Sequence, residues 1–168
     1  MDRINLKDKL QNRKSLFAGW TSLGHPQITE MLIRSGVDFL GIDIEHSTIS
    51  KEQSQRIIAA CHAGGVSCLP RVASHNPEDI KRLLDSGADG VIVPTVETPE
   101  QVEKLIEWVK YPPLGKRGYG VARAQGYGHN FEEYTTQWNK SSSLIIQIET
   151  VYAVENIGPK ASSKPIKI

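Results

Sequence analysis

Short apolar runs alternate with helical segments along most of the chain. The apolar runs cover about residues 16–22, 38–44, 67–72, 90–96 and 144–149, and they are nearly continuous. Continuous apolar strands are typical of parallel sheets whose two faces are both covered. The repeated order of strand and helix therefore predicts a series of parallel βα units.

Capping residues mark where the intervening helices begin. Ser50 is followed three residues later by Gln53, which fits a capping box, and Asn76 and Thr98 each precede a proline. A helix with one apolar face is also expected at about residues 27–35. Gly36, Gly64–Gly65 and Gly87 each precede an apolar strand, where a helix C-cap favours glycine, and this is the order that βα units require.

The spacing of the units favours a barrel. Successive strands are about 25–30 residues apart, which matches a (β/α)8 barrel of roughly 250 residues. A doubly wound sheet is the competing architecture, but the loop TSLGHPQ after the first strand has one glycine and lacks a glycine-rich phosphate turn. We therefore predict an α/β fold of the parallel (β/α)8 TIM-barrel type, with about the first five units in a single domain over 1–157. Residues 158–168 show no period and are expected to form an irregular tail.

Charge and cysteine content exclude several classes of protein. The 20 basic and 19 acidic residues leave a net charge of +1, which gives no attraction to nucleic acid or to an anionic membrane. No run approaches the roughly 20 apolar residues of a membrane span. Cys61 and Cys68 lack zinc-site spacing and are expected to be buried thiols, whereas His62 and His75 are expected at the surface. A cytoplasmic protein is the expectation.

Polar side chains gather where the predicted strands end. The stretch IDIEHS (42–47) ends the second strand with three titratable side chains, and Arg71 ends the third. Gln147 and Glu149 lie two apart on the fifth strand and so share one side of it. Carboxyl ends of parallel strands form the active-site rim of barrels. A base, a guanidinium, an amide and a carboxylate there predict an enzyme that binds an anionic substrate.

Several motifs occur in the order and spacing of a known family. They are DIEHS (43–47), LPRV (69–72), LLDSGADGVIVPTVETPEQ (83–101), YPPLGKRG (111–118) and QIETVYAVENI (147–157). Together they resemble the HpcH/HpaI metal-dependent class II pyruvate aldolases, a family that includes 4-hydroxy-2-oxoheptane-1,7-dioate aldolase and aldolases of 2-keto-3-deoxy sugar acids. The resemblance extends over nearly the whole chain.

The resemblance implies a barrel that cleaves a 4-hydroxy-2-oxo acid to pyruvate and an aldehyde, with Mg²⁺, Mn²⁺ or Co²⁺, in a homo-oligomer. It assigns acid–base catalysis to His46, enolate stabilisation to Arg71, and support of the histidine's basicity to Asp85. Gln147 and Arg71 would bind the substrate, and Glu149 would bind the metal. Asp85 fits less easily, because it lies near a predicted helix C-terminus that points away from the catalytic rim.

The sequence departs from the family pattern after the fifth strand. The family's second metal ligand is an aspartate beyond that strand, and no acidic residue follows Glu155 here. One carboxylate alone is a poor site for a hard metal ion. We therefore expect a C-terminally truncated barrel. It is either a lyase whose remaining barrel is supplied by another chain or is missing from the given sequence, or an inactive remnant or interaction module that lacks the second metal ligand.

Overall fold

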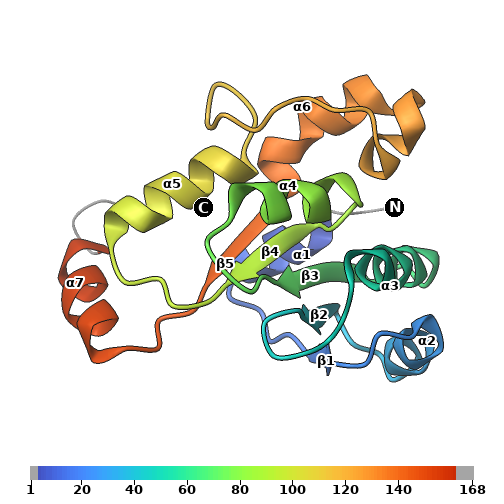
Figure 1. Cartoon of the computed structure of the whole chain (residues 1–168), viewed down its shortest axis with the longest axis horizontal. Coiled ribbons are helices and arrows are strands. Elements are labelled where there is room, and N and C mark those ends of the chain that lie inside the picture. Colours follow the sequence, from blue (N-terminus) through green and yellow to red (C-terminus); the bar gives the residue numbers. More distant parts are fainter. Residues whose placement is uncertain (1–3, 162–168) are drawn as a thin grey trace.

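A parallel sheet of five strands forms the centre of the molecule, in the order β1-β2-β3-β4-β5 (Figure 1). The computed structural model describes residues 4–161, and the side chains of residues 6–156. The strands are β1 (Ala18–Thr21), β2 (Phe39–Asp43), β3 (Ser67–Arg71), β4 (Gly90–Val93) and β5 (Ser143–Ile146). Doubly wound sheets reverse their strand order at a switch point. The unbroken order here is that of a barrel sector, so the barrel-type prediction is confirmed.

Helices follow the strands as the βα pattern predicts. Four of them are α2 (Pro26–Arg34), α3 (Lys51–Ala63), α4 (Pro77–Asp85) and α5 (Pro99–Val109). The predicted capping boxes of Ser50 with Gln53 and of Thr98 with Gln101 are both present. The helix α2 begins slightly earlier than expected because the imidazole of His25 caps it. Local capping chemistry therefore sets these helix starts.

Several elements were not anticipated. They are α1 (Ile4–Gln11), a 3-10 segment η1 (Arg123–Gly128), α6 (Phe131–Ser141) and α7 (Val151–Ala161). The helix α7 runs into the segment 158–168 that we expected to be irregular, and residues 162–168 lie outside the described part of the chain. No helix among the described residues is long and apolar enough to cross a membrane.

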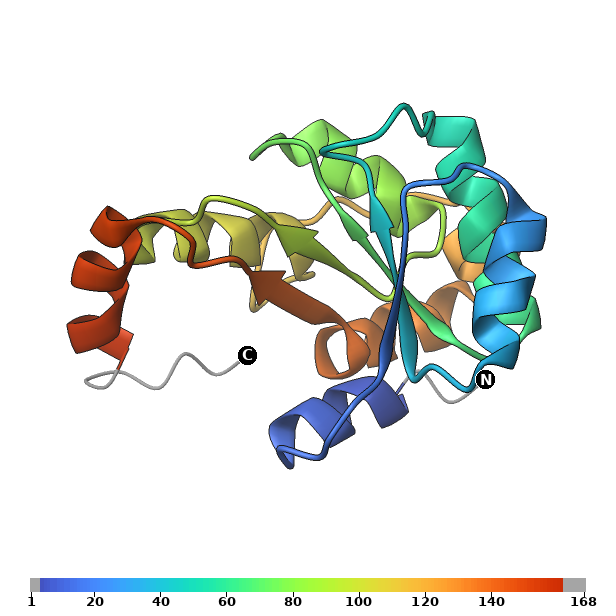
Figure 2. The same cartoon turned by 90° about the horizontal axis from the view of Figure 1, so that it is seen from below.

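Alternation along the strands divides their side chains between two faces. Outward side chains such as Leu40 and Val91 join a large apolar core beneath the helices. On the other face Leu69 and Ile92 pack with Leu6 of α1 in a small separate cluster. Figure 2 shows α1 across the sheet from α4. Since α1 covers only part of the inner face, the rest of that face can hold polar side chains.

The structure confirms the predicted burial of two cysteines and corrects the predicted exposure of two histidines. Cys61 and Cys68 are buried free thiols, as predicted. His62 is buried rather than exposed, because its Nε2 lies 3.3 Å from a carboxylate oxygen of Asp89. His75 is half-buried, with Nε2 2.8 Å from the carbonyl oxygen of Pro94. Both histidines have partners that lie far away in the sequence.

The close approach of β4 and β5 at Gly90 makes a first prediction. A Cβ atom at this position would lie 1.9 Å from the carbonyl oxygen of Ser143, so the β5 backbone would have to move. We expect Gly90→Ala to lower the free energy of unfolding by about 3 kcal/mol, the upper range for overpacking. Urea unfolding measures the loss. Gly118→Ala is the control, since it meets open space; equal effects of both substitutions would contradict the prediction.

Candidate active site

A bidentate ion pair joins the carboxyl ends of β2 and β3. Asp43 and Arg71 are paired neighbours in the register of these two strands. The Nε of Arg71 donates to Oδ1 of Asp43 at 3.2 Å, and its Nη2 donates to Oδ2 at 2.7 Å. Two parallel hydrogen bonds hold a guanidinium in one orientation. The pair therefore aims Arg71 along the inner face of the sheet.

The Asp43 carboxylate is almost fully buried, at 6% exposure. Burial alone would raise its pKa, but hydrogen bonds from Arg71 and from the backbone N–H of His46 outweigh burial and lower the pKa. The side chain is therefore an anion at neutral pH. Because the pKa of Asp43 is lower in the folded than in the unfolded protein, its ionised form stabilises the fold at neutral pH. This stabilisation is lost as the pH falls through the folded-state pKa.

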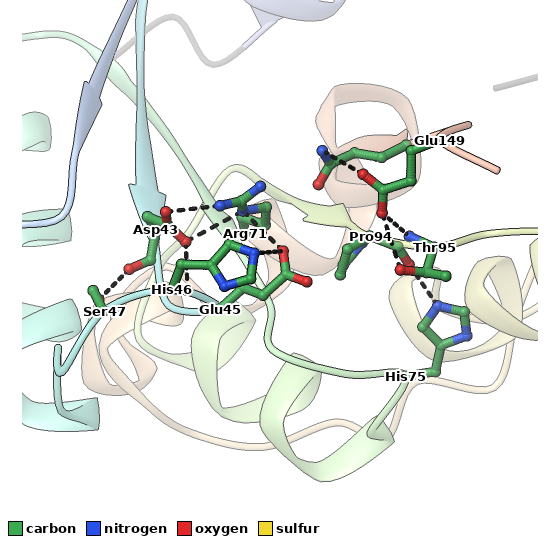
Figure 3. A network of polar contacts seen from close by, with 10 residues as sticks. Asp43, Glu45, His46, Ser47, Arg71, His75, Pro94, Thr95 and Glu149 are labelled. Carbon is green, nitrogen blue, oxygen red and sulfur yellow. Dashed lines mark hydrogen bonds and ion pairs between the residues drawn. The ribbon is translucent and has the colours of Figure 1, made fainter.

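Glu45 links the guanidinium to the candidate base. Its Oε2 lies 3.2 Å from Nε of Arg71 and 3.7 Å from Nε2 of His46. The side chain of His46 is 71% exposed, so its imidazole stands on the open rim beside this carboxylate (Figure 3). The structure thus brings together His46 and Arg71, the two residues predicted to perform the chemistry, through a third residue that has no assigned role.

An aromatic ring supports the guanidinium from β1. The ring of Trp20 lies 5.1 Å from the guanidinium carbon of Arg71, within cation–π range. Trp20 is also in register with Gly41, where a Cβ atom would lie 2.3 Å from the indole. The sequence signal for this contact is the position of Trp20 next to the last residue of β1, on the same face of the sheet as Arg71.

Glu149 and Gln147 form a second group at the end of β5. Oε1 of Glu149 accepts hydrogen bonds from the backbone N–H of Thr95 at 2.7 Å and from its hydroxyl at 3.0 Å (Figure 3). The Nε2 of Gln147 lies 3.5 Å from the other carboxylate oxygen. Thr95 has a left-handed backbone, with φ of 51°, which is costly for a branched residue and recurs at functional sites.

The buried Oε1 of Gln147 accepts no hydrogen bond from the described residues. A buried acceptor without a donor is unfavourable, so this atom is suited to meet a ligand donor or cation. No group of three or more His, Cys, Asp or Glu side chains within the described part of the chain could hold a metal ion. The described residues alone therefore do not make the site for Mg²⁺, Mn²⁺ or Co²⁺ that the resemblance implies.

Asp85 lies apart from these two groups. It ends α4, and the C-termini of helices in βα units lie at the opposite edge of the sheet from the strand ends. Its Oδ1 accepts a hydrogen bond from Nη2 of Arg117 at 2.8 Å. The guanidinium of Arg117 is buried and packs against the rings of Tyr111 and Trp138 at 4.7 and 4.6 Å. Within one chain, Asp85 thus pairs a buried cation rather than contacting His46.

These features define a class of protein: a (β/α)-barrel-type fold with a guanidinium, an imidazole and carboxylates on the rim of its strands. Residues 16–168 match the family model described as HpcH/HpaI aldolase/citrate lyase. The chain therefore belongs to the HpcH/HpaI aldolase/citrate lyase family, as the sequence motifs predict.

Characterised relatives carry aldolase names. The chain is 39% identical over 139 residues to a 4-hydroxy-2-oxovalerate aldolase of Novosphingobium aromaticivorans, covering 82% of this chain and 53% of that protein. It is 37% identical to a 2-dehydro-3,6-dideoxy-6-sulfogluconate aldolase of Pseudomonas putida, covering 88% of this chain and 58% of the relative. The chain thus spans somewhat more than half the length of these relatives.

A solved structure supports the fold over nearly the whole chain. A family member from Burkholderia cenocepacia superposes with a TM-score of 0.87 at 28% identity. The match covers 94% of this chain and 64% of that one. The five-stranded sheet therefore corresponds to a sector of a larger protein of the same family.

The pairing of Asp85 with Arg117 leads to a second prediction. Removing the carboxylate leaves a buried guanidinium without its anion, which is costly. We expect Asp85→Ala to lower the free energy of unfolding by about 2 kcal/mol, the range for hydrogen bonds to charged groups. Asp85→Asn keeps an acceptor oxygen and should lose less. Thermal and urea unfolding measure both, and unchanged stability in Asp85→Ala would contradict a structural role.

Proposed function

We propose that the chain carries the site of a carbon–carbon lyase that cleaves a 4-hydroxy-2-oxo acid to pyruvate and an aldehyde. The observation that carries this proposal is that Glu45 lies within ion-pair distance of both Arg71 and His46 on the open rim of the sheet. Membership of the family and the aldolase names of the relatives support the same reaction class.

Arg71 would stabilise the negative charge that develops on the substrate. Its contacts with Asp43 and Glu45 use Nε and Nη2, and Nη1 takes part in neither of them. In the retro-aldol step the electron pair of the C3–C4 bond moves onto the 2-oxo group and forms an enolate. A guanidinium that is already oriented stabilises that oxygen without reorganising during the reaction.

His46 would move the proton. A neutral imidazole can accept the proton of the 4-hydroxyl group, whose oxygen then becomes the aldehyde carbonyl as C3–C4 breaks. The imidazolium can return this proton to C3 of the enolate, which yields pyruvate and restores the neutral histidine. The Glu45 carboxylate lies 3.7 Å from Nε2 of this ring, on the rim where the substrate would bind.

Gln147 and Glu149 would bind the substrate and a divalent metal, respectively. The partnerless Oε1 of Gln147 suits a donor on the substrate. Glu149 is already oriented by Thr95, and it contributes one carboxylate. A second carboxylate for the metal would have to come from outside the described residues, so no chemical step is assigned to the metal.

Pyruvate release from a 4-hydroxy-2-oxo acid tests the proposed reaction. We expect His46→Ala to lower kcat by about 100-fold or more, the usual contribution of a general base. Arg71→Ala should lower it by about 100-fold, as for loss of an oxyanion-stabilising group. Coupled pyruvate detection measures the rate. His129→Ala, a loop histidine elsewhere, is the matched control; absence of pyruvate release by the folded wild-type chain would overturn the proposal.

Binding of Mn²⁺ separates the metal assignment from the reaction. We expect weak binding by the chain, since hard cations need several oxygen ligands and Glu149 supplies one carboxylate. The signal of free Mn²⁺ in electron paramagnetic resonance measures it. Glu149→Ala should abolish the residual binding, whereas Glu132→Ala, on the exposed start of α6, should leave it unchanged. Tight binding that survives Glu149→Ala would contradict the role of Glu149.

A further inference from the structure

The ladder between β4 and β5 contains one extra residue just after β4. The two strands pair in register as far as Val93, whose carbonyl oxygen accepts the N–H of Gln147 at 2.9 Å. In a regular parallel ladder the carbonyl oxygen of Gln147 would accept the N–H of Thr95. It accepts the N–H of Val96 instead, at 3.2 Å. The extra residue forms a bulge, a feature that recurs next to active sites, and it leaves the N–H of Thr95 outside the ladder.

Two side chains hold the peptide group at this bulge, one at each end. The N–H of Thr95 donates to Oε1 of Glu149 at 2.7 Å. The carbonyl group of the same peptide unit belongs to Pro94, and its oxygen lies 2.8 Å from Nε2 of His75. Figure 3 shows His75 and Glu149 on opposite sides of this peptide. A carbonyl oxygen only accepts, so Nε2 of His75 carries the proton and donates it.

The orientation of this peptide is unfavourable for the residue that follows it. Thr95 has φ of 51°, and a branched side chain makes the left-handed region costly. Rotating the planar peptide unit by half a turn would exchange its C=O and N–H groups and bring φ of Thr95 into the ordinary negative range. The N–H would then point away from Glu149. The observed orientation therefore persists only because neighbouring groups hold it.

The loop that carries His75 is itself anchored at both ends. At its start, Val72 donates its N–H to the carbonyl oxygen of Ile92 at 3.0 Å. At its end, the side chain of Asn76 caps α4. The loop also begins directly after Arg71, so it connects the two polar groups of the rim. The half-buried imidazole of His75 is thus a donor whose position is set by the scaffold rather than by the bulge.

We propose that His75 is a positioning residue. It holds the Pro94–Thr95 peptide in the orientation that presents its N–H to Glu149, and so fixes the direction of that carboxylate at the rim. A hydrogen bond to the carbonyl oxygen also polarises the peptide and strengthens its N–H as a donor. His75 acts through this peptide and is not placed in contact with the substrate. Its effect on the reaction rests on the proposed function, in which Gln147 and Glu149 act at this rim.

Nuclear magnetic resonance of the ¹⁵N-labelled full chain tests this role without catalysis. When the imidazole of His75 is neutral, its proton should be on Nε2. The Thr95 amide should resonate far downfield because it donates to a carboxylate. His75→Ala should move this resonance upfield and speed its hydrogen exchange by about tenfold or more. His129→Ala, in a loop elsewhere, is the control and should leave the resonance unchanged.

Glutamine and asparagine form a matched pair of substitutions at this position. The side-chain amide of glutamine can place an N–H close to the position of Nε2, whereas that of asparagine is one methylene shorter. His75→Gln should therefore keep the Thr95 signal, and His75→Asn should lose it as His75→Ala does. An unchanged Thr95 signal in His75→Ala would overturn the proposal. A neutral ring protonated on Nδ1, or equal signals in the glutamine and asparagine variants, would also overturn it.

Pyruvate release provides a separate kinetic measurement. The value of kcat/KM should fall by about tenfold in His75→Ala and His75→Asn and recover in His75→Gln. An active wild-type chain whose kcat/KM is the same in all three variants would overturn the part of the proposal that concerns the reaction. A wild-type chain that releases no pyruvate contradicts the proposed function, while the amide signal of Thr95 still decides the role of His75.

Discussion

The alternation of side chains along strands in parallel register is the constraint on which the rest of the molecule depends. Outward positions must be apolar because helices pack over them. Inward positions are covered only in part, where Leu6 of α1 meets Leu69 and Ile92. Beyond that cover, an inward side chain faces an open rim. The same alternation that places Leu69 on the inner face therefore places Arg71 there, two residues further along the strand.

The pair of Asp43 and Arg71 is better understood as an orienting device than as a source of stability. Desolvating two charges offsets much of their attraction, so a buried ion pair adds little net stability. Its geometry is nevertheless restrictive, because two hydrogen bonds and the ring of Trp20 all act on one guanidinium. Glu45 then couples that fixed cation to the exposed imidazole of His46. This arrangement suits a site in which a positively charged group is fixed in position before an anion binds.

The two ends of the sheet use their charges differently. At the carboxyl ends, charged groups face an open rim. At the other end, aromatic rings enclose the guanidinium of Arg117, which binds Asp85, and Lys110 binds backbone carbonyls next to α6. The charged groups at that second end stabilise contacts between helices and the loops that connect them. A motif match can assign a charged residue to the family pattern. Only its neighbours in space indicate whether, within one chain, it faces the open rim or stabilises contacts between elements.

Prediction from the sequence was most successful for features that depend on residues close together in the chain. Capping boxes at Ser50 and Thr98 set helix starts through contacts three residues apart, and the strands follow from uninterrupted apolar runs. The helices α1 and α6 were missed because α1 reads as a polar N-terminus, and α6 lies in the long connection between α5 and β5, where no strand precedes it. His62 was misplaced for a similar reason, since its partner Asp89 is 27 residues away.

The sequence by itself determined the barrel-type fold, the family and the set of polar residues at the strand ends. These depend on period, spacing and motif, which are properties of neighbouring residues. Only the tertiary structure decided how those residues pair: Glu45 between Arg71 and His46, Thr95 on Glu149, and Arg117 on Asp85. Such pairs join strands, helices and loops whose relative positions depend on the packing of the whole sheet and its helices, so no local pattern in the chain encodes them.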